Sequence, residues 1–538
     1  MNRQGRVLIV ENEQRWRDVL ADILRQGGFQ ADTAATLAEA RQYFADSFYH
    51  LTVLDIRMED DTDHTDIEGI NLLRQLSAGG LTEATQVLVL SAHGTKDQMR
   101  ESFKEHGIAD FLSKDEFDGR EFLRQVREIF AGKARINPNL VIHWQQITGP
   151  DQAVLNLAIE GERIKYKSPW RDRLAAELDD LLCRLFHRAD SLLVKPLTEG
   201  NSGLAVLLAT PSSAASGAGQ PFIVKFGDIQ SIAAEHERFQ DYVRNFIGGG
   251  RITNVIDHRR TAHLGGIVYS LLGTAGNRLE SFGSFYKRAD FSKIREVLDD
   301  IFLVTCSQWY ANPGRIEPRD LSAEYSALLE LTPEVLEQHR GNLKSAQGKE
   351  KLRIGNLAED RVFTNPIKVM AARRFIEHTY VCPTHGDLSE TNVLVDETGH
   401  TWLIDFGRTG PGHILRDVAT LDTAVRLHLL DECEATLEDR LKLEEALIRA
   451  GRFGDLQQLA GEFETDNPAL AKTYATVIHL RSLAHRLVER NLNASLREYY
   501  VALFYFGLSQ LKWYELPRIY REHALVSSSL LADKLEKG

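Results

Sequence analysis

Segment 381–417 constrains this chain most, because it spaces three polar side chains around a predicted hairpin. The tripeptide His385-Gly386-Asp387 is followed five residues later by Asn392, and Asp405 opens the tripeptide Asp405-Phe406-Gly407. Apolar runs on both sides of the turn 397–399 predict two short antiparallel strands, with a loop before them. The strand ends should therefore bring Asp387, Asn392 and Asp405 close to one point.

These three side chains are the set that phosphoryl transfer needs. One carboxylate accepts the proton of the attacking hydroxyl, while an amide oxygen and a second carboxylate hold Mg²⁺ on the nucleotide phosphates. We assign Asp387 as the base and Asn392 and Asp405 as the Mg²⁺ ligands. The segment resembles the catalytic segment of kinase-fold enzymes, in the His-Gly-Asp form of the aminoglycoside and choline phosphotransferases. The alternative is a chance Asp-rich loop beside a hairpin.

Composition excludes several other classes of protein. At 538 residues the chain is too long for one core, so roughly two to four domains are expected. A net charge of −13 without a basic recognition helix disfavours nucleic acid as a partner. The four scattered cysteines and the missing signal peptide fit a cytoplasmic location. The most apolar stretch, 499–514, contains Gln510 and Lys512, which favours a buried helix over a membrane span.

Residues 1–132 alternate apolar runs with helical patterns. The runs at 7–10, 51–54, 87–90 and 111–112 predict strands. Helical patterns follow, the first carrying Trp16 and Leu20 and ending at Gly27-Gly28, with others at about 36–46, 67–78, 95–106 and 117–131. Five such units predict a doubly wound α/β fold with a parallel sheet, which binds ligands at the carboxyl ends of its strands.

The residues at those strand ends are Glu11, Asn12, Asp55, Ser91 and Lys114. This pattern resembles a response-regulator receiver domain over its whole length. The resemblance implies that Asp55 accepts a phosphoryl group from a histidine kinase or phosphotransfer protein, and that Glu11, Asn12 and Asp55 hold Mg²⁺. It implies that Ser91 and Lys114 contact the phosphoryl oxygens, that Phe111 is the switch aromatic, and that the domain can form a homodimer.

Two positions depart from the receiver pattern. Asn12 stands where a second acid is usual, which is expected to weaken the metal site. An acidic loop crowds the phosphorylation site with Glu59, Asp60, Asp61, Asp63 and Asp66. Their repulsion would slow phosphorylation or raise the local Mg²⁺ concentration; the alternatives are a solvated loop that does neither, and a receiver that takes no phosphate.

Residues 133–170 are interpreted as a linker or docking segment, with strand patterns at 140–142 and 153–159. A strong helix follows to residue 186, and residues 171–275 form the predicted nucleotide-binding half. Its glycine loop contains Gly200, Asn201, Ser202 and Gly203 between two strands, which lets backbone N–H groups approach phosphates. Lys225 on strand 222–226 corresponds to the kinase lysine that reaches the α- and β-phosphates. The helix at about 229–246 offers Glu235 and Glu237, of which we favour Glu235 as the partner of Lys225.

Residues 276–538 are predicted to be mainly helical, with helices at about 291–310, 414–431, 437–450, 468–490 and 495–511. His385 and His413 are candidates for ordering the catalytic loop, and Asp417 matches the carboxylate that steadies this loop in kinase-fold phosphotransferases. The polar region 312–366 is where we expect the acceptor site. Residues 171–530 also resemble the kinase-like ternary complex-associated domains. The resemblance implies an α+β bilobal fold, with lobes at 171–275 and 276–538.

Together these patterns predict a signalling enzyme. Phosphorylation of Asp55 would control ATP- and Mg²⁺-dependent transfer to a hydroxyl acceptor. Two alternatives stay open. One is a receiver-gated pseudokinase that binds nucleotide and a protein partner without catalysis, and the other is a Ser/Thr protein kinase.

Overall fold

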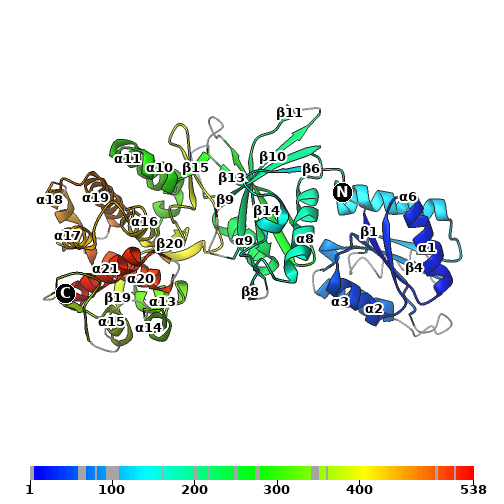
Figure 1. Cartoon of the computed structure of the whole chain (residues 1–538), viewed down its shortest axis with the longest axis horizontal. Coiled ribbons are helices and arrows are strands. Elements are labelled where there is room, and N and C mark those ends of the chain that lie inside the picture. The colour runs from blue at the N-terminus through cyan, green and yellow to red at the C-terminus, as the bar shows by residue number, and fades with distance from the viewer. Residues whose placement is uncertain are drawn as a thin grey trace. The chain divides into compact units, whose positions relative to one another are not determined.

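The chain folds into two compact units. The first contains residues 1–236 and 254–271, and the second contains residues 237–253 and 272–538. The computed structural model (Figure 1) describes residues 5–58, 68–78, 81–92, 108–159, 161–198, 203–214, 217–246, 252–272, 279–340, 350–358, 361–459, 461–490, 495–513 and 516–537.

The first unit begins with a five-stranded parallel sheet in the order β2-β1-β3-β4-β5. Its strands are β1 (Arg6–Val10), β2 (Gln30–Ala34), β3 (Leu51–Leu54), β4 (Gln86–Ser91) and β5 (Asp110–Ser113). The four predicted strands are confirmed. The sequence patterns missed β2, because this edge strand reads QADTA and has no apolar run.

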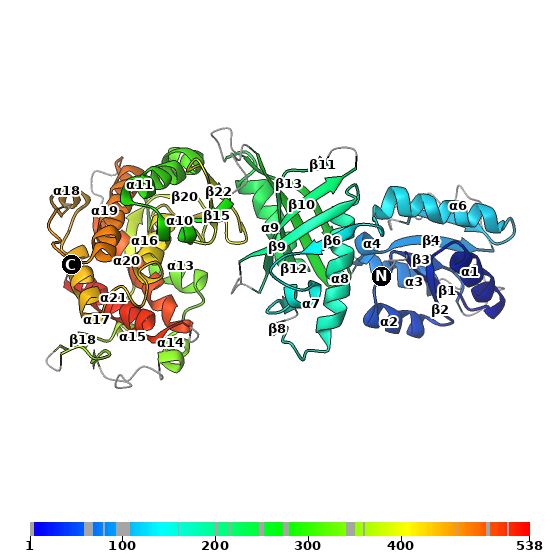
Figure 2. The ribbon, with the colours of Figure 1, turned by 45° about the horizontal axis from the view of Figure 1, so that its top comes forward.

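Helices cover both faces of this sheet (Figure 2). They are α1 (Gln14–Gln26), α2 (Leu37–Asp46), α3 (Glu68–Ala78), α4 (Leu81–Ala84) and α6 (Gly119–Ile129), which continues as a π-helical turn, Phe130–Ala134. One apolar core lies between the sheet and α1 and α6, and a second lies between the sheet and α2 and α3. Two buried faces explain the continuous apolar runs of β1, β3 and β4. The helix predicted at about 95–106 lies outside the described residues.

A second, largely antiparallel sheet completes the first unit, in the order β13-β14-β12-β10-β9-β6 with β11 beside β10. Its strands are β6 (Val141–Trp144), β9 (Ser191–Thr198), β10 (Ala205–Ser213), β11 (Gly217–Ala218), β12 (Phe222–Asp228), β13 (Ile252–Arg260) and β14 (Leu264–Leu272). Helix α8 (Trp170–Leu185) packs its leucines on this sheet, and α9 (Ile229–Tyr242) follows β12.

Residues 133–170, interpreted as a linker or docking segment, form part of the second sheet and its core, and the strand expected at 140–142 is confirmed as β6. Strand β6 pairs in parallel with β9, and Leu140, Val154 and Ile164 belong to the same core as α8. The strand expected at 153–159 is replaced by the short helix α7 (Pro150–Ala153) and the small hairpin β7 (Ala158–Ile159) and β8 (Glu162–Arg163). Pro150 sits at the first helical position after Gly149, where its missing N–H is tolerated.

The second unit contains the predicted hairpin. Strands β21 (Val393–Asp396) and β22 (Thr401–Leu403) pair antiparallel, and β15 (Leu279–Ser281) joins them. Three further strand pairs are short: β16 (Glu317–Asp320) with β19 (Ile376–Thr379), β17 (Lys351–Leu352) with β18 (Phe363–Thr364), and β20 (Val381–Thr384) with β23 (Gly410–His413).

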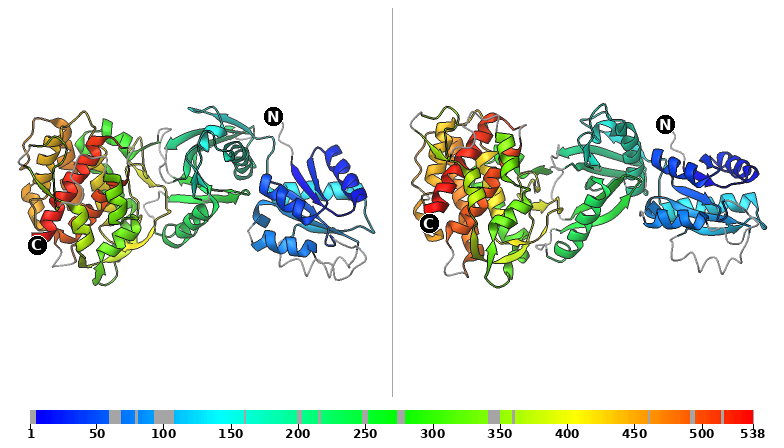
Figure 3. Two further views of the ribbon diagram at one scale, coloured as in Figure 1. Left: turned by 60° about the horizontal axis from the view of Figure 1, so that its bottom comes forward. Right: turned by 90° about the horizontal axis from the view of Figure 1, so that it is seen from below.

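Helices make up most of the second unit (Figure 3). They are α10 (Phe282–Arg288), α11 (Phe291–Asp299), α12 (Ser307–Ala311), α13 (Leu321–Leu328), α14 (Pro333–Arg340), α15 (Pro366–Ala372), α16 (Arg416–Leu427), α17 (Leu437–Leu447), α18 (Leu456–Leu459), α19 (Pro468–Val488), α20 (Leu496–Ser509) and α21 (Arg518–Lys537). Within the described ranges, no helix is both long enough and apolar enough to cross a bilayer.

The single helix predicted at 291–310 is wrong. The chain instead forms α11, a π-helical segment Asp300–Thr305, and α12. Asp300 accepts hydrogen bonds from the backbone N–H and the hydroxyl of Thr401 at 3.0 and 2.7 Å. This contact with the hairpin is made by the first residue of the π-helical segment, and a helical periodicity does not reveal it.

A buried ionic network holds α16 against its neighbours. Arg426 on α16 donates to Asp422 at 2.5 Å and to Glu444 on α17 at 2.7 Å. Arg481 on α19 donates to Asp422 at 3.0 Å. Each charge is paired, as burial requires. The network fixes α16, whose first turn carries Asp417.

Candidate functional site

The carboxyl ends of β1, β3 and β5 bring three charged receiver residues together. Lys114 Nζ lies 2.6 Å from Asp55 Oδ2 and 2.9 Å from Glu11 Oε2. All three side chains are buried. Burial, and after it the charge of Asp55, raises the pKa of Glu11 to about 7. Burial lowers the pKa of Lys114, but the two carboxylates outweigh it and the net shift is upward. Two carboxylates share one cation here, so the site holds excess negative charge.

This receiver site fits Mg²⁺. Glu11 and Asp55 supply carboxylate oxygens, and the buried Oδ1 of Asn12 accepts no hydrogen bond from the described part of the chain. Oxygen ligands of this kind suit a hard cation, which keeps waters or phosphate oxygens in its other positions. Across the described residues, no cluster of three or more His, Cys, Asp or Glu side chains could hold a metal by itself, so oxygens of water or phosphate would have to complete the shell.

The other predicted receiver residues occupy defined places. Ser91 is buried at the end of β4, next to β5 in the sheet. Phe111 is 1% exposed and packs in the core between the sheet and α2 and α3. The five acids of the loop 59–66 lie outside the described residues.

In the second sheet, Lys225 on β12 forms a buried ion pair with Glu235 on α9, at 2.5 Å. The partner is therefore Glu235, not Glu237. The other oxygen of Glu235 accepts a hydrogen bond from the Tyr269 hydroxyl on β14 at 2.8 Å. All three side chains are at most 1% exposed. The sequence analysis missed Tyr269, because an aromatic residue in an apolar strand reads as core.

Only one residue of the predicted glycine loop can be placed. Gly200, Asn201 and Ser202 lie outside the described residues. Gly203 has a φ of +77°, and a Cβ there would lie 2.5 Å from the Cβ of Ala158. Glycine is therefore required at this position.

The catalytic loop predicted in the second unit is held by Asp417. Its carboxylate accepts hydrogen bonds from the backbone N–H groups of His385 and Gly386 at 2.7 and 2.9 Å, and from the Tyr310 hydroxyl at 2.8 Å. Gly386 has a φ of +84°, and a Cβ there would collide with the carbonyl oxygen of Arg408. The loop therefore has one backbone path, set by a buried carboxylate and a glycine.

Hydrogen bonds also bring Asn392 beside Asp387 and Asp405. The Asn392 side-chain amide donates to the backbone carbonyl of Asp387 at 2.8 Å, and the N–H of Ile404 donates to the carbonyl of Asn392 at 3.0 Å. The amide nitrogen is thus used within the loop, and the amide oxygen is the atom that a metal would take. Asp405 adopts a φ of +69°, a strained backbone for a non-glycine residue. The amide oxygen and the carboxylate fit Mg²⁺.

Aromatic side chains pack against one another at the predicted catalytic loop. The ring of Phe406 lies 5.5 Å from those of both Phe239 and His385. His385 Nε2 donates to the carbonyl of Ile404 at 3.0 Å. The His385 ring therefore connects the loop to the residue that precedes Asp405.

His413, the other candidate for ordering the loop, lies elsewhere. Its ring nitrogens face the Tyr325 hydroxyl at 2.7 Å and Glu498 at 3.3 Å. This imidazole ties β23 to α13 and α20, so the prediction that it orders the catalytic loop is wrong.

A histidine beside the loop predicts a pH-dependent stability. His428 Nδ1 lies 2.9 Å from a carboxylate oxygen of Glu390, and His428 Nε2 lies 2.8 Å from the side-chain oxygen Oε1 of Gln510. The side-chain nitrogen of Gln510 donates to the carbonyl of Phe506. Both ring nitrogens therefore donate, which requires the protonated ring. Burial lowers the pKa of His428, but the charge of Glu390 together with the hydrogen bonds to Glu390 and Gln510 outweighs burial, so the pKa is raised.

A raised histidine pKa stabilises the fold below about pH 6.5 and loses this contribution at higher pH. We expect the free energy of unfolding to fall above that pH by at most about 1.4 kcal/mol per pH unit, the limit for one proton. Urea titrations between pH 6 and 9 measure this slope. His428→Gln should flatten it, and His400→Gln, in the exposed hairpin turn, should not. An equal slope in His428→Gln would contradict the assignment.

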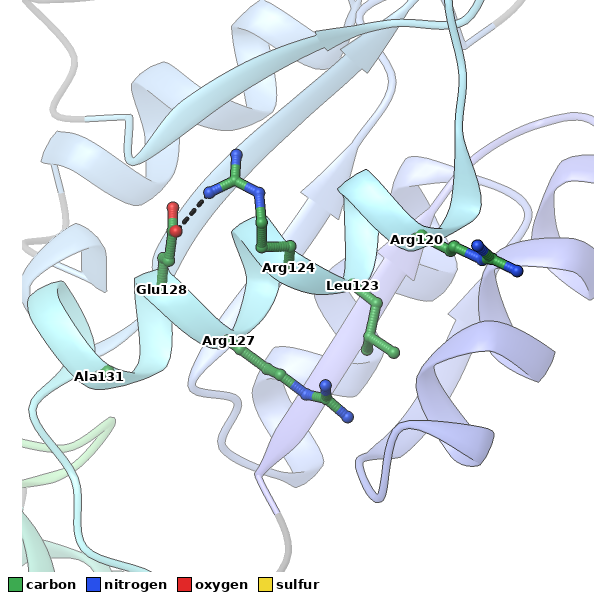
Figure 4. Close-up of a pocket in the computed structure, with 6 residues that line it drawn as sticks. All are labelled: Arg120, Leu123, Arg124, Arg127, Glu128 and Ala131. Atoms are coloured by element: carbon green, nitrogen blue, oxygen red, sulfur yellow. Dashed lines mark hydrogen bonds and ion pairs between the residues drawn. The ribbon is translucent and has the colours of Figure 1, made fainter.

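Two pockets of the described surface lie away from the predicted site residues. One shallow pocket of about 480 Å³ lies on α6 and is lined by Arg120, Leu123, Arg124, Arg127, Glu128 and Ala131. In Figure 4 Arg124 turns toward Glu128, with which it forms an ion pair, while Leu123 and Arg127 point to the other side of the helix. A second, of about 580 Å³, lies between α11 and α19.

Comparison with known proteins assigns both parts of the chain. The response regulator receiver domain family matches residues 7–127. The family described as ternary complex associated domain 9 matches residues 189–357 and 338–512, which together exceed half of the chain. The chain belongs to the ternary complex associated domain 9 family. The expected receiver domain and ternary complex associated domain are therefore confirmed.

Three individual relatives each match about a quarter of this chain. Protein PetR of Rhodobacter capsulatus is 30% identical over 123 residues, which are 23% of this chain and 47% of PetR. Transcriptional regulatory protein GltR of Pseudomonas aeruginosa is 26% identical over 130 residues, 24% of this chain and 50% of GltR. The chain thus spans about half the length of these curated relatives. A CheY-like receiver protein of Methanospirillum hungatei is 22% identical, with a TM-score of 0.21, covering 24% of this chain and 94% of its own.

Proposed function

We propose that this protein is a two-component signalling enzyme in which phosphorylation of Asp55 controls a kinase-fold phosphotransferase. That phosphotransferase uses ATP and Mg²⁺ and acts on a hydroxyl acceptor. The buried Lys225–Glu235 pair carries the proposal. A lysine ammonium is rarely buried unless it is paired. Here the partner, Glu235, is itself oriented by Tyr269. A lysine that binds phosphate oxygens must be held in one position, and this arrangement holds Lys225 in that way.

Residues of the second unit supply the base, the Mg²⁺ ligands and the support of the loop, and Lys225 of the first unit contacts the phosphates. Asp387 orients the acceptor hydroxyl and takes its proton as the hydroxyl oxygen bonds to the γ-phosphorus. The bond from the γ-phosphorus to the β–γ bridging oxygen breaks, and ADP leaves with those electrons. Asn392 and Asp405 hold Mg²⁺, which neutralises phosphate charge when bound. Lys225 contacts the α- and β-phosphates. Asp417 keeps the loop in the shape that these roles need.

The segment after Asp405 favours a small-molecule acceptor over a protein. Protein kinases carry an activation segment with a phosphorylation site after the Asp-Phe-Gly tripeptide. Here β23 begins at Gly410 and pairs at once with β20, and α16 begins at Arg416. This leaves little chain on which a peptide could lie. It is also the observation that separates this reading from the Ser/Thr kinase alternative.

A product screen with labelled ATP tests the proposal. The full chain is incubated with ATP–Mg²⁺ and panels of hydroxylated small molecules and proteins, and labelled products are separated. Lys225→Gln keeps a hydrogen-bond donor for Glu235 but removes the charge. We expect it to bind ATP at least about tenfold more weakly, because charge-assisted hydrogen bonds contribute about 1.5–3 kcal/mol.

Lys165→Ala is the control, since Lys165 is an exposed lysine of the same unit. ATP affinity in Lys225→Gln equal to that of Lys165→Ala would remove Lys225 from the nucleotide site. Clear ATP binding with no labelled product would favour the pseudokinase alternative.

A further inference from the structure

The receiver contacts helix α8 through a buried polar cluster within the first unit. His50 Nε2 lies 2.6 Å from Asp180 Oδ1, and Arg184 Nε donates to Asp180 Oδ2 at 2.8 Å. Arg184 also donates to the backbone carbonyl of Ala84 at 2.7 Å. His50, Asp180 and Arg184 are each at most 5% exposed. A buried cluster with every charge paired is a specific contact, because removing one partner leaves an uncompensated charge.

The hydrogen-bond pattern fixes the protonation of His50. The backbone N–H of Arg6 donates to His50 Nδ1 at 2.8 Å, so this nitrogen is the acceptor. The proton therefore sits on Nε2, which donates to Asp180. One imidazole thus joins the first strand of the receiver to α8.

The receiver side of this contact is connected to the phosphorylation site. His50 immediately precedes β3, which is followed directly by Asp55, and Ala84 lies two residues before β4, which ends at Ser91. These strands are neighbours in the sheet, and the N–H of Gln86 donates to the carbonyl of His50 at 2.9 Å. Helix α8 therefore holds the starts of the two strands whose ends carry the phosphoacceptor and the switch serine.

The same helix reaches the nucleotide-binding residues. Glu177 lies three residues before Asp180, on the same face of α8. It accepts hydrogen bonds from the Thr261 hydroxyl at 2.7 Å and from the backbone N–H of His263 at 2.9 Å, in the turn between β13 and β14. Strand β14 then carries Tyr269, which holds Glu235 beside Lys225.

We propose that α8 is an internal bridge through which the state of Asp55 reaches the Lys225–Glu235 pair, with His50–Asp180–Arg184 as the receiver contact and Glu177 as the contact with the β13–β14 turn. This rests on the proposed function, because its last step ends on the nucleotide-binding lysine. The surface involved is the amino-terminal edge of the receiver sheet, opposite the phosphorylation site.

Hydrogen exchange in the full chain tests the bridge without requiring catalysis. Beryllofluoride with Mg²⁺ serves as the probe that mimics phosphorylated Asp55. In the wild type we expect exchange in peptides covering 170–185 and 258–266 to change by at least about fivefold, the lower end of ordinary allosteric coupling. In His50→Ala the peptide containing Asp55 should still respond, while 170–185 and 258–266 should not.

Matched variants keep the test decisive. His50→Gln places an amide donor near the Nε2 position and should restore the response, and it also serves if His50→Ala folds poorly. Asp172→Asn, on an exposed part of α8, should behave as the wild type. A response confined to the receiver in the wild type, or an unchanged response at 258–266 in His50→Ala, would overturn the bridge.

Nucleotide binding separates the two proposals. Beryllofluoride should shift the affinity for a fluorescent ATP analogue by about 5- to 150-fold in the wild type, and not in His50→Ala. If the chain binds no nucleotide, the proposed function fails while the exchange result still decides whether α8 carries the signal.

Discussion

Replacing Asp387 with asparagine should slow ATP-dependent phosphoryl transfer by about 100- to 10,000-fold, the usual contribution of a positioned general base. The loop should survive the change, since Asn392 bonds to the backbone carbonyl of Asp387 and not to its carboxylate. Asparagine can orient a hydroxyl but cannot take its proton. ADP formation under saturating ATP and acceptor measures the rate, and ATP affinity should stay within about twofold because the nucleotide contacts are retained.

Glu397→Gln is the matched control for this variant. Glu397 is an exposed carboxylate in the turn of the neighbouring hairpin, so its loss should leave the rate unchanged. If Asp387→Asn turns over as fast as Glu397→Gln, Asp387 is not the base, and the assignment of this loop as catalytic falls with it.

Replacing Asp417 with alanine should destabilise the second unit and remove activity together. The change leaves two backbone N–H groups and the Tyr310 hydroxyl without their acceptor in a fully buried position. Each unsatisfied buried group costs about 1–3 kcal/mol, so the loss should reach at least about 3 kcal/mol. Denaturant midpoints measure the stability, and ADP formation measures the activity below the transition.

Graded variants separate this role from simple destabilisation. Asp417→Asn keeps one oxygen acceptor and should fall between the wild type and the alanine variant. Glu296→Ala removes an exposed carboxylate from α11 and should change stability by less than about 0.5 kcal/mol. A fully active Asp417→Ala variant would show that the carboxylate does not set the loop.

Local patterns gave the receiver almost completely. Short apolar runs bounded by helical patterns located four of its strands, and the polar residues just after them located the cluster of Glu11, Asp55 and Lys114, because parallel strands end at a common edge. The strand they missed, β2, has a polar edge sequence. In the second unit, the apolar triplets on both sides of 397–399 located the hairpin, because strand alternation and turn chemistry are properties of neighbouring residues.

Tertiary contacts decided what local patterns could not. No local pattern within residues 133–170 predicts that β6 will pair with β9, about fifty residues away, and none near Asp300 predicts its hydrogen bond with Thr401. His413 and His385 look equivalent in the sequence. In the structure the His385 ring donates to the carbonyl of Ile404, next to Asp405, while the His413 ring faces the Tyr325 hydroxyl.

The sequence by itself therefore determined which chemical groups this protein carries and in which order: an aspartate directly after a receiver strand, a strand lysine, and a loop with Asp387, Asn392 and Asp405. Spacing along a strand or loop is enough to specify these. Only the tertiary structure decided that Tyr269 orients Glu235, that Asp417 closes the loop, and that His50 meets Asp180. These are single buried hydrogen bonds between distant residues, and burial, which makes them strong, is a property of the folded chain alone.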